Sequence, residues 1–409
     1  MAIISAFRAL RPTKELASLV ASLPYDVLSS SEARILGDKN PYSFLHITKA
    51  EIDLLEETDV HSEKVYLKAA DNLFIFQDNK ILKRDERPSY YIYELTMNGR
   101  NQTGLVCVSA VADYENNIIK KHELTRPEKE LDRINHMLIT GAQTGNVFLA
   151  YKSNVSLSQQ ISSWKKAHEP ACDFIAADGI GHRVWVVNDQ QTITEITTIF
   201  HKQIPFTYIA DGHHRAASAA KVKNAPGNNA NPDAGYFLTT LFPSDELRIM
   251  DYNRLLKDLN GLETTHFLEK LNNHFRVEKI NEPYSPNRLH NFGMYLEGNW
   301  YHLEAKENSF PNDPVGILDV SILQENILSP ILGIQDQRTD SRIDFVGGIR
   351  GLKELEKRVD SGQMKLAFSL YPVSMDQLFD IADSGQIMPP KSTWFEPKLR
   401  DGLFTHLIR

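Results

Sequence analysis

The chain has 409 residues, 42% of them apolar and 24% charged, with Gly and Pro contents that are ordinary for a globular protein. This composition excludes collagen-like, low-complexity and disordered proteins, and the length is sufficient for two or three domains. Acidic residues outnumber basic ones by 53 to 45, a net charge of −8, and Lys and Arg form no long run, so dedicated nucleic-acid binding is not expected.

Cysteine usage and hydropathy indicate a reduced, soluble protein. Cys107 and Cys172 are too few for a disulfide framework, and their separation excludes a Cys-x-x-Cys metal site. Arg8 interrupts the short apolar stretch at the N-terminus, which lacks the pattern of a signal peptide. Because no segment approaches the length of a membrane span, we expect a cytoplasmic protein.

Segments of strand character alternate with segments of helical period, which predicts a mixed α/β fold. The expected helices cover residues 63–76, 157–167, 264–274, 320–327 and 352–359. The expected strands cover residues 90–95, 105–111, 147–151, 184–187, 206–209, 236–242, 293–297, 300–303 and 366–371.

Turn and cap residues mark three further features. Gly298-Asn299, between two of the expected strands, predicts a two-residue hairpin turn. Ser374 and Gln377 form a capping-box pair at the start of another helix. The stretch 224–232, rich in Asn, Gly and Pro, is long for a connection between a helix and a strand and is expected to be a loop.

The most informative segment is a short apolar strand that passes through a sharp turn into an Ala-rich helix. Asp211 and Gly212 stand at this turn, and His213, His214 and Arg215 follow in the first helical turn. Free backbone N–H groups and the positive end of the helix dipole favour an anion there, and Gly allows a close approach of the backbone. Arg is suited to a bidentate contact with phosphate oxygens. The pattern therefore predicts a phosphate site.

Two other interpretations of this segment remain. Asp211 can simply cap the helix, with the histidines as ordinary surface or core residues. A zinc site is less favoured, because adjacent histidines point to different faces of a helix and cannot both bind one metal ion.

A second segment places Lys121, His122 and Glu123 side by side. A carboxylate next to an imidazole can accept a proton from a hydroxyl group if its pKa is suitably raised by burial. The alternative is a charged, solvent-exposed turn that leads into a helix.

A third segment contains Lys391, Ser392 and Thr393 directly after two prolines. It offers one positive charge and two hydroxyl groups but lacks the glycine spacing of a P-loop. An ordered loop near the C-terminus is the alternative. The spacing does not decide whether Asp26 and His46 take part in a site.

These three segments, taken in this order, resemble the pattern of the archaeal free serine kinases, over residues 116–398. The full-length chain resembles most a larger bacterial family of unknown function related to them. The resemblance implies a ParB/sulfiredoxin-like nucleotide-binding core over residues 116–232, preceded by an N-terminal α/β extension, residues 1–115. A C-terminal α/β domain, residues 233–409, would complete the site.

The resemblance also implies roles for the residues of the three segments. Glu123 would accept the proton of the serine hydroxyl group, with His122 beside it as a further catalytic residue. Asp211 would act nearby, on the metal ion or the attacking group. The residues expected to hold nucleotide phosphates are Gly212, His213, His214 and Arg215. The residues expected to contact the transferred phosphate are Lys391, Ser392 and Thr393.

The expected activity is the interconversion of L-serine and O-phosphoserine with ADP or ATP and Mg²⁺, with the net direction and a homo-oligomeric state left open. The alternatives are a nucleotide-binding switch or DNA-associated module of the same superfamily, a phosphoserine phosphatase, and a kinase for another hydroxyl compound. No membrane or nucleic-acid partner is expected.

Overall fold

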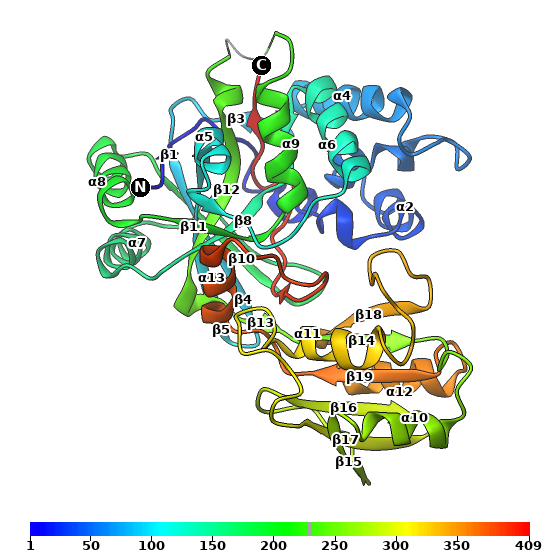
Figure 1. Ribbon diagram of the computed structural model, residues 1–409. Coiled ribbons are helices and arrows are strands. Elements are labelled where there is room, and N and C mark those ends of the chain that lie inside the picture. Colours follow the sequence, from blue (N-terminus) through cyan, green and yellow to red (C-terminus); the bar gives the residue numbers. More distant parts are fainter. Residues whose placement is uncertain (228–230) are drawn as a thin grey trace. The chain divides into compact units, whose positions relative to one another are not determined.

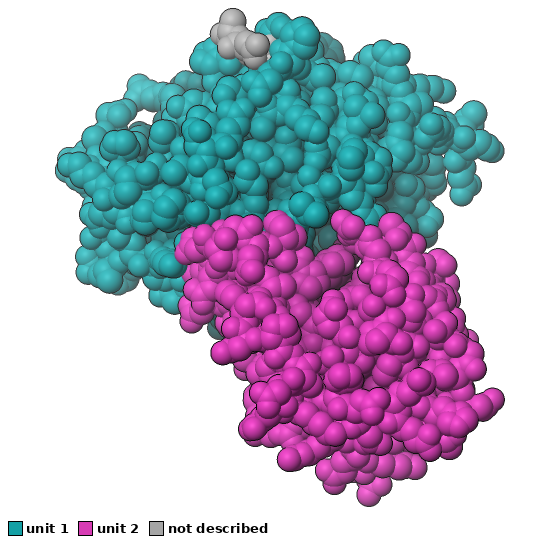
Figure 2. All heavy atoms as spheres, in the orientation of Figure 1, with its two compact units in different colours: residues 1–247, 397–409 teal, residues 248–396 magenta. Residues whose placement is uncertain are grey.

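The computed structural model describes residues 1–227 and 231–409, so residues 228–230 of the expected loop lie outside the described residues. The chain forms two compact units, coloured separately in Figure 2. Unit 1 contains Met1–Leu247 and Pro397–Arg409, and unit 2 contains Arg248–Glu396. The fold is mixed α/β, as the alternation of strand and helix patterns predicts.

The unit boundaries differ from the expected ones at residues 115 and 232. Strands β4 (Tyr90–Met97) and β5 (Arg100–Ala110) lie inside the same sheet as β12 (Tyr236–Pro243), and β5 pairs directly with β12. Residues 1–115 are therefore part of unit 1 rather than a separate extension. Composition does not reveal this pairing, because the paired strands are far apart in the chain.

The centre of unit 1 is a nine-stranded mixed sheet (Figure 1). β11 runs parallel to β6 and antiparallel to β8, and β8 runs parallel to β12. The strand order is β6 (Ile119–Lys120), β11 (Thr207–Asp211), β8 (Val147–Tyr151), β12, β5, β4, β10 (Gly181–Val187) and β9 (Cys172–Ile175), with β1 (Ile4–Ser5) also paired to β5.

Alternate residues of the central strands serve opposite faces of this sheet, as the two-residue period of a strand requires. Tyr90 and Ile92 belong to a core that also contains side chains of α5 (Val111–Glu115), α7 (Val155–Ala167), α8 (Gln190–Gln203) and α9 (His213–Lys223). Tyr91 points the other way, where its ring contacts Phe7 and Phe404. The C-terminal segment thus covers the face that these four helices leave free.

A row of helices extends unit 1 beyond the sheet. α6 (Pro127–Thr140) packs against both α4 (Glu63–Asp78) and α9 (Figure 1). The remaining short elements of unit 1 are β2 (Leu10–Pro12), α1 (Ala17–Val20), η1 (Tyr25–Val27), α2 (Ser30–Asp38), α3 (Leu45–Thr48), η2 (Ala50–Asp53), β3 (Leu82–Arg84), β7 (Ala142–Gln143), η3 (Asp233–Gly235), η4 (Ser244–Glu246) and β21 (His406–Leu407).

Unit 2 is built on a six-stranded antiparallel sheet. Leu355 and Val359 of α12 (Leu352–Asp360) share a hydrophobic core with side chains of this sheet. Its strand order is β15 (Phe275–Ile280), β17 (Asn299–Ala305), β16 (Asn291–Leu296), β19 (Leu366–Leu370), β14 (Tyr252–Leu256) and β18 (Ile343–Gly347). The other elements are the pair β13 (Ile249–Met250) and β20 (Trp394–Phe395), with α10 (Thr264–Leu271), α11 (Asp319–Leu323), the π-helical η5 (Gln324–Leu328), η6 (Gly348–Arg350) and α13 (Met375–Ser384).

Some local signals of unit 2 were read correctly from the sequence, but three strands of its sheet, β14, β15 and β18, were not among the expected ones. The capping box of Ser374 and Gln377 starts α13, as predicted. The hairpin turn is shifted by one residue: Glu297 and Gly298 form it, with φ of 50° and 73°, and Asn299 already pairs with β16. A two-residue turn in which both central residues have a left-handed backbone matches the twist of the flanking strands. This requirement places the turn at Glu297 and Gly298.

Candidate functional site

The first two predicted segments meet at one edge of the unit 1 sheet. β6 and β11 are parallel neighbours, so the chain leaves both strands in the same direction. β6 continues into a loop, residues 121–126, and β11 continues into α9. The register of β11 shifts between Ile209 and Asp211, and such an irregularity changes the direction of the side chains that follow it. The topology therefore brings Glu123 and Asp211 to the same edge.

Gly212 joins β11 to α9 and is the N-cap residue of the helix. Its φ of 98° favours glycine, and a Cβ atom here would lie 3.1 Å from Nε of Arg215. Because glycine has no side chain to cap the helix, the first N–H groups of α9 are left to another acceptor. This is the geometry that binds anions at helix N-termini.

The Asp211 carboxylate faces two cations rather than the helix it precedes. Its Oδ2 accepts a hydrogen bond from Nζ of Lys398 (3.2 Å), and its Oδ1 lies 3.6 Å from Nη2 of Arg215. Burial acts to raise the pKa of Asp211, but Lys398 and Arg215 outweigh it and hold this pKa well below its usual range. Asp211 is thus ionised at neutral pH, with a third of its side chain exposed.

The Arg215 side chain is buried and directed into unit 1. Its Nη2 also lies 3.6 Å from Asp26 Oδ2, and its Nη1 donates to the carbonyl oxygen of Asn146. Burial alone would lower the pKa of Arg215, but Asp26 and Asp211 raise it above its ordinary value. Across the described ranges, Nε of Arg215 has no hydrogen-bond partner. Arg215 therefore links two carboxylates and keeps one donor unused.

The loop of residues 121–126 is bound to the first turn of α9. The backbone N–H of His122 donates to Nε2 of His213 (3.4 Å), and that of Arg126 donates to Nε2 of His214 (3.0 Å). Nδ1 of His213 lies 3.7 Å from Oε2 of Glu123, whose side chain is 31% exposed. The structure thus brings together the residues that were predicted from the first and second segments.

Within this loop, the His122 side chain is a fully buried imidazole. Its ring meets that of His213 edge-on, with 4.6 Å between the centroids. Burial and His213 lower the pKa of His122 to about 3, although Glu123 and Asp211 oppose the shift, so the ring is neutral. Neither ring nitrogen has a hydrogen-bond partner among the described residues.

The structure also decides between the two residues that the spacing left open. Asp26, in η1, contacts Arg215 and so lies beside the residues predicted from the first segment. His46 does not: its ring nitrogens contact Asp53 Oδ1 (2.7 Å) and the Asn40 carbonyl oxygen (3.2 Å). Asp53 raises the pKa of His46 against the effect of burial, which fits a structural ion pair.

Two residues of the C-terminal segment that interact with Asp211 or Arg215 were missed in the sequence. Lys398 follows the third predicted segment in the sequence, and the cation predicted there was Lys391 instead. Asp401 is 2% exposed, and burial raises its pKa to about 7 although Arg215 acts to lower it. No spacing in the sequence connects Asp401 with residue 215.

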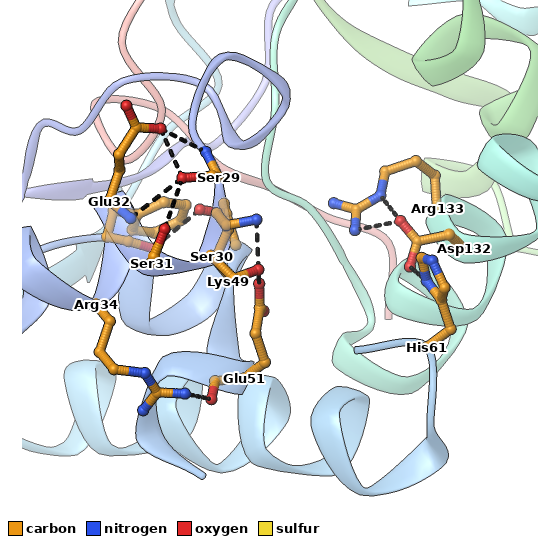
Figure 3. A network of polar contacts seen from close by, with 12 residues as sticks. Ser29, Ser30, Ser31, Glu32, Arg34, Lys49, Glu51, His61, Asp132 and Arg133 are labelled. Atoms are coloured by element: carbon orange, nitrogen blue, oxygen red, sulfur yellow. Dashed lines mark hydrogen bonds and ion pairs between the residues drawn. The ribbon is translucent and has the colours of Figure 1, made fainter. Parts of the chain in front are cut away.

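The segment that carries Asp26 is anchored on both sides. Cζ of Arg133, in α6, lies 3.9 Å from the centroid of the Tyr25 ring. Arg133 also donates to Asp132, which accepts a second hydrogen bond from His61 (Figure 3). Next along the chain, Ser29 and Glu32 form a capping box at the start of α2 (Figure 3). A cavity of about 20 Å³, enough for one water molecule, is lined by Tyr25, Arg133, Gly145 and Arg215 among other residues.

The third predicted segment lies in unit 2. Ser392 is buried and its hydroxyl group donates to the Pro389 carbonyl oxygen (2.6 Å). Lys391 is exposed, has a left-handed backbone (φ 58°), and its carbonyl oxygen accepts from Nη2 of Arg254 (3.0 Å). Thr393 is half-buried.

A dedicated metal site is not present in the part of the chain that the structure describes, where no three His, Cys, Asp or Glu side chains are grouped to hold an ion. The Mg²⁺ of phosphoryl-transfer enzymes needs only one or two carboxylates besides phosphate oxygens and waters. The partly exposed carboxylate of Asp211 fits that lesser requirement.

A family described as "Protein of unknown function (DUF1015)" matches residues 4–321, and the chain belongs to this family. The chain is also similar to solved structures, each over about three quarters of its length. One is a conserved hypothetical protein from Pyrococcus furiosus, with 13% identity, a TM-score of 0.36, and coverage of 74% of this chain and 94% of that chain.

A free serine kinase in complex with AMP is similar at 13% identity and a TM-score of 0.35, with coverage of 73% of this chain and 92% of that chain. SbnI with C-terminal truncation from Staphylococcus aureus is similar at 10% identity and a TM-score of 0.32, with coverage of 72% and 85%. The comparison with curated proteins found no match. Throughout residues 1–227 and 231–409, no helix is both long and apolar enough to cross a membrane.

Proposed function

We propose that this protein is a phosphotransferase that exchanges a phosphoryl group between an adenine nucleotide, ADP or ATP, and the hydroxyl group of L-serine. The observation that carries the proposal is the uncapped N-terminus of α9 at Gly212, with the Glu123 carboxylate held at its first turn. An anion site next to a proton acceptor is what phosphoryl transfer to a hydroxyl group requires. The resemblance of the sequence segments to free serine kinases supports serine as the acceptor.

In this proposal, the serine oxygen forms a bond to the terminal phosphorus while the bond from that phosphorus to the bridging oxygen of the nucleotide breaks. The hydroxyl proton passes to Glu123, and the nucleotide leaves with the electron pair, as AMP from ADP or as ADP from ATP. The reverse reaction returns the proton from Glu123 to the serine oxygen. The first N–H groups of α9 bind phosphate oxygens, and Mg²⁺, when bound, neutralises part of their charge. For Lys391, Ser392 and Thr393 the proposal rests on the sequence resemblance alone.

Phosphoryl exchange tests the proposal directly. The protein is incubated with L-serine, Mg²⁺ and either ADP or ATP, and in a second set with O-phosphoserine and AMP or ADP, while ³¹P NMR follows the phosphorus species. We expect O-phosphoserine to form or to be consumed with one nucleotide pair. Absence of exchange in both sets would reject the proposal. Phosphate release without nucleotide would identify a phosphatase, and nucleotide binding without transfer would identify a binding module.

The role of Glu123 is tested by Glu123→Gln, which keeps the shape of the side chain but removes the base. We expect kcat to fall by a factor of about 10² to 10⁴, the usual contribution of a general base, with nucleotide binding unchanged by calorimetry. Glu128→Gln, at an exposed position on α6, is the matched control and should keep wild-type kcat. Full activity of Glu123→Gln would show that another group accepts the proton.

A further inference from the structure

The loop that carries Glu123 is fixed at both ends. At its start, β6 is paired with β11 through Ile119 and Thr207. At its end, α6 is docked on α9, where the Ser218 hydroxyl group donates to the Glu130 carbonyl oxygen (3.1 Å). Between these points the loop has little apolar burial of its own, since the Leu124 side chain is 62% exposed.

Two imidazoles of α9 bind the loop on either side of Glu123. Nε2 of His213 accepts the N–H of His122, and Nε2 of His214 accepts the N–H of Arg126, so that only Glu123, Leu124 and Thr125 lie between the two contacts. An Nε2 atom that accepts a hydrogen bond carries no proton, and in a neutral imidazole the proton is then on Nδ1. Nδ1–H of His213 therefore faces the Glu123 carboxylate at 3.7 Å.

Burial keeps both rings in this state. It lowers the pKa of His213 to about 3, with Asp211 opposing the shift, and it lowers the pKa of His214, assisted by Lys129. A protonated ring could not accept the backbone N–H, so the low pKa values and the two hydrogen bonds agree.

We infer that His213 and His214 are positioning residues that hold the Glu123 loop against the first turn of α9. The inference rests on the proposed function for the role of Glu123, but the contacts themselves exist whatever reaction follows. In this inference the side chains and the backbone of the first helical turn have different roles. The imidazoles bind the loop, and the backbone N–H groups remain for phosphate oxygens. Holding a reacting group in place removes the cost of ordering it during the reaction.

Amide hydrogen exchange together with kinetics tests this inference. His213→Phe and His214→Phe keep a planar ring but remove the acceptor, whereas His213→Gln and His214→Gln can supply an amide oxygen near the Nε2 position. We expect the Phe variants to increase exchange of residues 121–126 and to lower kcat about tenfold, the equivalent of one hydrogen bond, with the nucleotide KM unchanged. The Gln variants should restore protection and most of kcat.

Lys223→Gln, at the far end of α9, is the control and should change neither exchange of the loop nor kcat, because Lys223 pairs with Glu115 instead. Wild-type exchange in both Phe variants would overturn the inference. An increase in nucleotide KM with unchanged kcat would also overturn it, since the imidazoles would then contact phosphate. If the protein transfers no phosphate at all, the proposed function fails while the exchange measurements still decide the loop contacts.

Discussion

Arg215 in unit 1 and Arg254 in unit 2 are both buried cations, but their surroundings are opposite. Arg215 faces the carboxylates of Asp26 and Asp211, which raise its pKa above the ordinary value against the effect of burial. Arg254 is 0% exposed, and burial lowers its pKa to about 10. Its guanidinium donates only to backbone carbonyl oxygens, those of Tyr252, Pro390 and Lys391 among the contacts that the structure describes.

The difference separates two uses of a buried arginine. Arg215 balances the negative charge of a site, because it joins carboxylates from η1 and β11 that would otherwise repel each other. Arg254 holds a loop, because it satisfies carbonyl oxygens on both sides of the left-handed Lys391. A change at Arg215 should therefore act on electrostatics, and a change at Arg254 on local order. Three predictions test this distinction.

The largest expected effect comes from Arg215→Met. Removing the cation leaves Asp26, Asp211 and Asp401 without their shared partner, and breaking a buried ion pair in this way costs about 3 kcal/mol of unfolding free energy. Chemical denaturation at pH 7 measures the loss. Arg215→Lys is the control, because it keeps the charge and should retain part of the unfolding free energy that Arg215→Met loses. A loss below that of Arg254→Met would contradict the distinction between the two arginines.

A smaller effect is expected from Asp401→Asn, and it depends on pH. The pKa of Asp401 is about 7 in the folded protein and 3.8 as a free side chain, so ionisation between these values favours the unfolded state. The unfolding free energy of the wild type should fall relative to the variant by roughly 1.4 kcal/mol per pH unit from pH 4 to pH 7. Below pH 4 and above pH 7 the difference should be constant.

Denaturation curves between pH 3 and pH 8 provide the measurement. Asp319 of unit 2 provides a matched comparison. Burial raises the pKa of Asp319 to about 7 as well, so Asp319→Asn should show the same slope. Arg215 lowers the pKa of Asp401. When Arg215→Met is also present, the pH-dependent fall in unfolding free energy that Asp401→Asn removes should therefore continue to higher pH, and the fall that Asp319→Asn removes should not. An equal change for Asp319→Asn would show that the effect does not come from the Arg215 cluster.

The smallest effect on stability is expected from Arg254→Met. The variant removes the Arg254 donor from three carbonyl oxygens, but it also removes the cost of burying a cation, so the net loss should be about 1 kcal/mol. Amide exchange of residues 389–394 should rise while exchange in unit 1 stays unchanged. A loss as large as that of Arg215→Met, or exchange spread over the whole chain, would show that Arg254 is more than a local support.

Local signals explain why much of the fold could be predicted. Residues 147–151 form the expected strand because an apolar run of that length can be buried on both faces of a sheet. The capping box at Ser374 was readable because its two side chains and the helix they cap are neighbours in the chain. The turn at Gly298 was placed one residue late, since glycine indicates a left-handed position but does not say which neighbour shares it.

The arrangement of residues at the end of β11 was predicted for the same reason. Asp211, Gly212 and the following helical turn are adjacent in sequence, so their arrangement at a strand end could be inferred. The inward direction of Arg215 could not, because it depends on Asp26 and Asn146, which come from other segments. The use of the two imidazoles as acceptors for backbone N–H groups left no pattern in the sequence either.

By itself the sequence determined the class of fold, the positions of helices such as α4 and α7 and of strands such as β8 and β12, and the sharp turn between β11 and α9, since these follow from periodicity and from neighbouring residues. The tertiary structure decided the grouping into two units, the burial of Arg215, and the recruitment of Lys398 and Asp401. Lys398 and Asp211 are 187 positions apart and still form one ion pair. Such contacts depend on how strands pair and where the chain returns, which local composition does not encode.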